Sequence, residues 1–159
     1  MPLTGTAAAV GQDMARAMTL ATTGQALPQA LDSSDGADAA TAAAKTAMAA
    51  NAKLILGPLR ADQVAAVLAV AGQVPVVTFS NDESLAGSGA FIFGVTPAQS
   101  VATMFSYAKA QGAKRIALVA ADTPFGRSSA IAAQAIAAAG GLNLSATLLR
   151  DPAAPGIVG

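Results

Sequence analysis

The stretch LILGPLRADQVAAVLAVAGQVPVVTFS, residues 54–80, holds two short apolar runs on either side of an alanine-rich segment. The runs are residues 54–56 and 74–78, and neither alternates polar with apolar side chains. Continuous apolar runs of this kind are typical of parallel strands that are buried on both faces. The segment between them, residues 60–71, has the composition of a helix. Strand, helix and strand in this order predict a right-handed crossover between parallel strands.

The same alternation continues on both sides of this stretch. Further strands are expected at residues 116–119 and 142–149, and a weaker one at 27–31, where Pro28 lacks the N–H of a ladder residue. Helices are expected over residues 7–20, 37–50, 60–71, 97–111 and 124–139. The pattern predicts an α/β fold in three layers, a mostly parallel sheet with helices on both faces.

Local sequence signals mark the helix ends. Thr96 before Pro97 and Thr123 before Pro124 each combine a capping side chain with a proline in the first turn. Gly112 and the pair at 140–141 follow helices at the position where glycine ends them.

Composition excludes several classes of function. The chain is 53% hydrophobic and 11% charged, and its nine basic and nine acidic residues cancel, so neither disorder nor nucleic-acid binding is expected. The sequence has no Cys and no His, which excludes cysteine nucleophiles, Cys/His zinc sites and serine–histidine triads. It carries no phosphate loop, dinucleotide fingerprint or calcium loop. We expect a protein that is not an enzyme and that needs neither cofactor nor metal.

Segments along nearly the whole chain resemble type I periplasmic binding proteins, in the family's order. Residues 2–5 and 10–14 resemble the first loop and helix, residues 54–59 the third strand, and residues 74–82 the fourth. Residues 91–97 resemble the crossing into the second lobe, and residues 116–119 with 122–126 its first strand and loop. Gly-Pro-Leu at 57–59 and Phe-Ser-Asn-Asp at 79–82 look closest to penicillin-binding-protein activators, outer-membrane lipoproteins that stimulate peptidoglycan synthases. Branched-chain amino acid receptors of ABC transporters are the neighbouring branch.

The resemblance implies two lobes, with residues 1–95 in lobe 1 and residues 96–159 at the start of lobe 2. It places the family's first strand before Pro2, inside the lobe 1 sheet, so we expect a chain truncated at both ends. An interior gap exposes the backbone groups of both neighbouring strands. The chain is therefore expected to rearrange, or to exchange a strand with a second copy as a homo-oligomer. No secretory signal is present, and the resemblance implies a full-length parent in the periplasm or an outer-membrane lipoprotein.

Ligands of open α/β sheets bind beyond the carboxyl ends of the strands. Three loops are predicted to reach that edge from lobe 1, and one loop of lobe 2 faces them across a cleft that closes on the ligand. Helix starts at this edge favour an anionic group such as a carboxylate. The candidate ligand-binding residues are Thr4, Gly5, Leu59, Arg60, Ser80, Asn81, Thr123 and Phe125, with Gly126 beside them.

Each candidate also has a purely structural interpretation. Gly5 and Gly126 suit turns, and Arg60 suits a solvated first turn of a helix. Residues 80–82 suit a turn or cap cluster, and Phe125 suits the core. The sequence leaves these alternatives open.

Three functions are compatible with these patterns. The first is a regulator of peptidoglycan synthesis that acts by contact with a synthase, and the second is a receptor that delivers an amino acid or similar solute to an ABC transporter. The third, an enzyme, is the weakest, because adjacent carboxylates such as Asp82 and Glu83 do not make an acid–base pair. Leu59 and Arg60 stand where amino acid receptors carry small hydroxyl residues, which favours the regulator.

Overall fold

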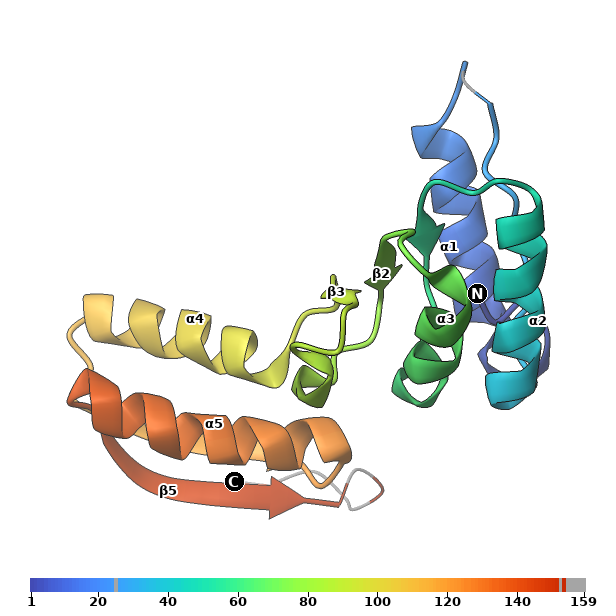
Figure 1. Cartoon of the computed structure of the whole chain (residues 1–159). Coiled ribbons are helices and arrows are strands. Elements are labelled where there is room, and N and C mark those ends of the chain that lie inside the picture. The colour runs from blue at the N-terminus through green and yellow to red at the C-terminus, as the bar shows by residue number, and fades with distance from the viewer. Residues whose placement is uncertain (25, 152, 154–159) are drawn as a thin grey trace. The chain divides into compact units, whose positions relative to one another are not determined.

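The computed structural model describes residues 1–24, 26–151 and 153. The chain divides into two compact units, Met1–Gly94 and Val95–Gly159. The division lies beside the predicted boundary after residue 95, and the assignment of the units to two lobes stays a prediction. Each unit combines helices with a parallel sheet, which confirms the predicted α/β fold class (Figure 1).

Unit 1 begins with two consecutive helices, after which short strands and helices alternate along the chain. Its three-stranded sheet has the order β1–β2–β3, and both neighbouring pairs are parallel. The elements are η1 Gly5–Ala7, α1 Ala8–Ala21, α2 Gly36–Ala49, β1 Ile55–Leu56, η2 Ala61–Gln63, α3 Val64–Ala71, β2 Val76–Thr78, η3 Glu83–Leu85 and β3 Phe91–Ile92.

One strand prediction for unit 1 is wrong, and one strand was not predicted. Residues 27–31 form no strand, because Pro28 offers no N–H and no described strand pairs with this segment. Residues 91–97, interpreted as the crossing between lobes, begin with strand β3, which pairs with β2 through Val77 and Phe91. The described part of unit 1 therefore has a sheet of three parallel strands.

The core of unit 1 lies between two helices and the middle strand. Ala40 and Ala44 of α2 pack with Val67 and Ala71 of α3 and with Val76 of β2. The alanine side chains are small, so the helix backbones approach the sheet closely. The alanine-rich composition thus serves close helix packing.

Unit 2 holds a single crossover. Helix α4, Pro97–Ala110, is followed by β4, Arg115–Ala121; α5, Pro124–Gly140, then returns the chain to β5, Asn143–Arg150 (Figure 1). The two strands are parallel, with an irregularity between Ile116 and Ala117. Val101 and Phe105 of α4 pack against Ala133 and Ala137 of α5, and apolar side chains of both strands complete this core.

One face of the β4–β5 sheet is exposed among the described residues. Burial alternates along β4, and Val119 is 57% exposed where it lies opposite Leu148, which is 49% exposed. The apolar run at 116–119 therefore forms a strand, β4, whose two faces differ in burial among the described residues. The residues of β4 after Arg115 are all apolar, but exposed and half-buried residues alternate along the strand.

The predicted helix ends are confirmed in unit 2. The Thr96 hydroxyl accepts a hydrogen bond from Gln99 N, and the Gln99 side chain accepts one from Thr96 N, a complete capping box. The Thr123 hydroxyl accepts from Gly126 N in the same way at the start of α5. Gly141 ends α5 with a φ of 67°, in the left-handed region that glycine adopts without strain.

Replacement of Thr96 by Ala is expected to lower the free energy of unfolding by about 1 kcal/mol, the usual effect of losing a helix cap. Thr96 is 8% exposed, and its hydroxyl satisfies one backbone donor in the first turn of α4. Urea denaturation followed by circular dichroism measures the change. Thr103→Ala on the exposed part of the same helix is the control and is expected to stay within about 0.5 kcal/mol. Equal effects of the two substitutions would contradict the role of the cap.

Candidate functional site

The loops after β1 and β2 lie side by side at the carboxyl ends of these strands. The Thr78 hydroxyl donates to the Pro58 carbonyl at 2.8 Å, and Phe79 N donates to the same oxygen at 3.1 Å. Thr78 is 0% exposed, so these bonds are shielded from water. They fix the loop that carries Leu59 and Arg60 against the loop that carries Ser80 and Asn81.

The loop at Thr4 and Gly5 is tied to the segment that precedes α2. The Thr4 hydroxyl donates to Asp32 Oδ2 at 2.7 Å, and Thr4 N donates to Ser34 Oγ at 3.0 Å. Gly5 begins η1 with a φ of 70°, a conformation that favours glycine. The turn interpretation of Gly5 is therefore consistent with its backbone.

Gln63 links that segment to the loop after β1. Its side chain is 1% exposed, and Nε2 donates to the Ser33 carbonyl at 2.6 Å and to the Gly36 carbonyl at 3.2 Å. The bonds of Thr4, Gln63 and Thr78 thus connect the three predicted loops of unit 1 in a continuous chain of contacts. The sequence predicts that these loops share one edge, and the geometry of unit 1 agrees.

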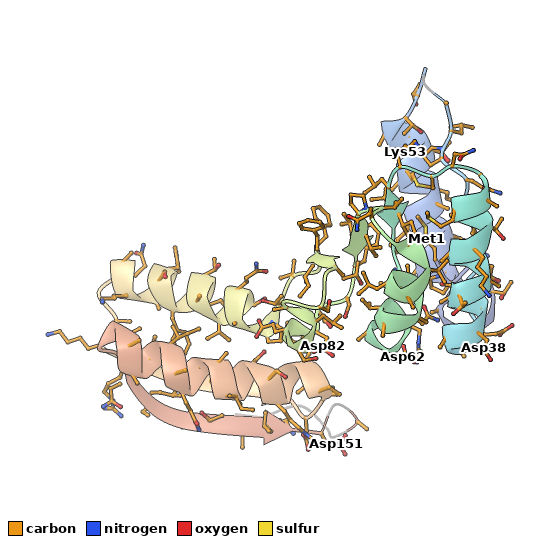
Figure 2. The ribbon with its side chains drawn as sticks, viewed as in Figure 1. Met1, Asp38, Lys53, Asp62, Asp82 and Asp151 are labelled. Atoms are coloured by element: carbon orange, nitrogen blue, oxygen red, sulfur yellow. The ribbon has the colours of Figure 1, made fainter. Side chains whose placement is uncertain are left out.

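The charge of Arg60 is already paired within its own loop. Its Nε donates to Asp62 Oδ1 at 3.1 Å and its Nη2 to Asp62 Oδ2 at 3.0 Å. This hydrogen-bonded guanidinium holds the pKa of the Asp62 carboxyl below its usual value. Asp62 belongs to η2 at the start of α3 (Figure 2). Leu59, the residue before Arg60, is half-buried.

The loop after β2 is held by its own side chains. Ser80 is 4% exposed; its hydroxyl accepts from Asp82 N at 3.1 Å, and its N donates to Thr78 Oγ1 at 3.1 Å. Asp82, which is labelled in Figure 2, accepts from Ser84 N at 2.9 Å, and the hydrogen bonds from Ser84 lower the pKa of Asp82. Asn81 is exposed. The cap-cluster interpretation accounts for Ser80 and Asp82, and Asn81 keeps a free surface position.

In unit 2 the predicted residues surround the carboxyl end of β4. Thr123 caps α5 and Phe125 is 39% exposed. Gly126 is buried, and a Cβ on it would lie 1.9 Å from the Ala121 carbonyl oxygen. Gly126 is therefore required for close packing of α5 on β4. Asp122 pairs with Arg127 at 2.6 Å beside them.

Polar residues that organise the site in unit 1 were not among the predicted ones: Asp32, Ser33, Ser34, Gln63 and Thr78. The sequence carried a signal for the first three, because Asp-Ser-Ser between two helices is a typical turn and cap composition. Asp32 receives hydrogen bonds from the Ser34 and Thr4 hydroxyls and from Leu3 N, and these donors hold its pKa well below the usual value.

The pKa of Asp32 predicts a loss of stability in acid. Because the folded-state pKa is lowered, its contribution is present above the unfolded-state pKa of about 4 and is lost as the pH falls below it. Asp32→Asn is expected to lower stability at pH 7 and to flatten the decline between about pH 4 and pH 2. Unfolding midpoints across pH measure this, with Asp35→Asn as the neighbouring control. A profile for Asp32→Asn that parallels the original chain would contradict the assignment.

The described residues hold neither a metal-binding cluster nor a membrane-spanning helix. No group of three or more His, Cys, Asp or Glu side chains there is placed to hold a metal ion. No helix in the same part of the chain is both long and apolar enough to cross a membrane.

A family model described as periplasmic binding protein matches residues 1–154. The chain belongs to the periplasmic binding protein family. The resemblance read from the loops after β1 and β2 is thereby confirmed at the level of the family. A comparison with curated protein sequences gave no match.

Solved structures of both predicted branches resemble this chain. A putative branched-chain amino acid ABC transporter from Rhodospirillum rubrum has a TM-score of 0.76 at 22% identity, over 96% of this chain and 49% of that one. An ABC transporter substrate-binding protein from Sphaerobacter thermophilus has a TM-score of 0.73 at 18% identity, over 99% and 47%. Full-length LpoA from Haemophilus influenzae has a TM-score of 0.72 at 18% identity, over 94% and 28%.

The shared fold is the finding that these identities support. The chain spans about half the length of the two transporter proteins and less of LpoA. Family and structural relatives are binding proteins, so unit 1 presents the loop edge of a binding-protein fold.

Proposed function

We propose that this periplasmic binding-family chain is a non-catalytic module of the cell envelope that regulates peptidoglycan synthesis, in the manner of a penicillin-binding-protein activator. Its partner is a peptidoglycan synthase, and its parent protein lies in the periplasm or at the outer membrane as a lipoprotein. The module acts by surface contact with the synthase, so it needs no acid, base or nucleophile of its own.

The observation that carries this proposal is the pairing of the polar loop residues within unit 1. Arg60 is hydrogen-bonded to Asp62, and Thr4 is hydrogen-bonded to Asp32. Ser80 is buried, and its hydroxyl accepts a hydrogen bond from Asp82 N. A receptor for an anionic solute needs donors that are free to bind a carboxylate. The Thr4 hydroxyl and the Nε and Nη2 of Arg60 already donate to carboxylates, and the Ser80 hydroxyl already accepts from Asp82 N. Freeing Arg60 would leave the Asp62 carboxylate without its cation.

The second candidate is a solute-binding protein of an ABC transporter for amino acids or similar small molecules. Two of the three structures described above come from ABC transporter proteins, at 22% and 18% identity. In this case the ligand contacts these residues of unit 1: Thr4, Gly5, Leu59, Arg60, Ser80 and Asn81. The Arg60–Asp62 pair would then open when a ligand binds.

Calorimetric titration of free amino acids into the protein at its full encoded length separates the two candidates. The regulator predicts no binding tighter than millimolar across the panel, from a sample that circular dichroism shows to be folded. Binding at micromolar affinity or tighter that is lost in Ser80→Ala would establish a solute receptor and refute the regulator. Ser88→Ala, an exposed serine outside the predicted site, is the control substitution.

A further inference from the structure

Unit 2 carries its positive and negative charges at different ends of its sheet. Asp122 directly follows β4, and Asp151, which is labelled in Figure 2, directly follows β5. Residues 95–159 contain no other Asp or Glu, so the carboxylate side chains of this unit lie at the carboxyl ends of the strands. Three cations, Lys109, Lys114 and Arg115, lie before or at the amino end of β4. This end of unit 2 therefore holds cations without a carboxylate side chain.

The three cations lie around one short segment, residues 140–143. Lys109 Nζ donates to the Gly140 carbonyl at 2.8 Å, and Asn143 N donates to the Lys114 carbonyl at 3.1 Å. Arg115 lies opposite Asn143 in the β4–β5 ladder. All three basic residues are exposed. We call Lys109, Lys114 and Arg115 together the basic end of unit 2.

One member of the basic end also stabilises a helix. Gly140 is the last residue of α5, and a cation beside the carbonyl end of a helix is favourable. Lys109 therefore has a structural role. Within the described part of the chain, the side chains of Lys114 and Arg115 make no ion pair and no hydrogen bond. Their charges are available to a partner.

The carboxylates of unit 2 are too far away to neutralise the basic end. Strand β4 has seven residues, and a strand rises about 3.3 Å per residue, so its two ends are roughly 20 Å apart. Attraction between exposed charges is largely screened beyond about 8 Å at physiological ionic strength. Residues 95–159 also have five basic residues against two acidic ones, so the net charge of the unit is positive.

We propose that the basic end of unit 2 docks an acidic segment of the peptidoglycan synthase, an inference that rests on the function proposed above. Carboxylates on such a segment accept charge-assisted hydrogen bonds from Lys and Arg. Complementary charge also speeds association and fixes the orientation of the two proteins.

An anionic bilayer matches the basic end less well. The large apolar residues around it, Ile116, Leu142 and Leu144, are half-buried, and the exposed residues among 109–116 and 140–145 are small or polar. No apolar anchor is therefore available there to enter a membrane. A few cations without such an anchor hold a protein to lipid only weakly. A protein partner is the better match.

The test uses interferometry with the synthase immobilised and the protein at its full encoded length in solution. The double variant Lys114→Gln/Arg115→Gln removes two charges that make no contact in the described part of the chain. At about 50 mM NaCl its Kd for the synthase is expected to rise about tenfold, mainly through slower association. Lys45→Gln/Lys53→Gln removes the same charge from exposed positions of unit 1 and is expected to leave the Kd within about twofold.

Salt provides a second readout. Raising NaCl to about 300 mM is expected to bring the Kd values of the unaltered protein and the double variant together, because the charges are then screened. Equal Kd values at low salt would overturn the docking surface and leave the proposed function intact. Absence of synthase binding by the folded protein would overturn both. Unchanged synthase binding, with loss of binding to phosphatidylglycerol vesicles in the double variant, would assign the basic end to a lipid surface instead.

Discussion

Gly126→Ala is expected to lower the free energy of unfolding by about 3 kcal/mol, near the top of the usual range for overpacking. A Cβ at this position would lie 1.9 Å from the Ala121 carbonyl oxygen and 3.4 Å from the Ala120 Cβ. The first contact is with backbone of β4, which cannot rotate away as a side chain could. Helix α5 must therefore shift, and its contacts with both strands of unit 2 weaken.

Gly140→Ala is the matched control for this substitution. Gly140 lies on the same helix, a Cβ added to it would meet no atom within 4 Å, and its φ is not positive. Alanine there is expected to be neutral or to stabilise the helix by up to about 1 kcal/mol. Urea denaturation gives both values, and hydrogen exchange locates the loss in residues of unit 2. A Gly126→Ala protein as stable as Gly140→Ala would refute the close-packing role.

Gln63→Ala is expected to destabilise unit 1 by about 3 kcal/mol. The side chain is 1% exposed, and its Nε2 serves the carbonyls of Ser33 and Gly36 at once. Truncation leaves these two oxygens without that donor and opens a cavity between η2 and the start of α2. Both effects act at the junction that connects the loops of the candidate site.

Two further variants separate hydrogen bonding from packing at this position. Gln63→Met fills similar space without the donor, so it is expected to lose about half of the effect of Gln63→Ala. Gln73→Ala alters an exposed glutamine and is expected to stay within about 0.5 kcal/mol. Chemical denaturation of the three variants measures the series. Equal stability of Gln63→Ala and Gln73→Ala would contradict the connecting role.

Helix starts and the positions of β1 and β2 could be predicted from the sequence because their signals are local, although β1 is exposed at Leu56 and not buried on both faces. Thr96 and Pro97 determine the start of α4 with atoms that lie within one helical turn. The apolar runs at 54–56 and 74–78 predicted β1 and β2, which pair in parallel as the crossover requires. These features depend on neighbours in the chain.

Features that depend on distant partners could not be predicted. Residues 27–31 have apolar side chains, but a strand also needs a neighbour, and no described strand pairs with them. The sequence suggested that Gly126 lies in a turn or contacts a ligand. In the structure glycine is needed there because the Ala121 carbonyl, across the packing interface, leaves no room for a Cβ. Arg60 suggested a ligand contact, and its rotamer instead places it on Asp62. Side-chain pairing of this kind follows from the folded geometry.

The proposed regulation of peptidoglycan synthesis is tested most directly by interferometry, with the protein at its full encoded length passed over an immobilised peptidoglycan synthase of the same organism. We predict saturable binding of the synthase, with a Kd that free amino acids do not change. Arg60→Ala is expected to change this Kd by less than twofold, because the Arg60 side chain is hydrogen-bonded to Asp62. Absence of synthase binding by the folded protein, together with micromolar binding of a free amino acid, would contradict it.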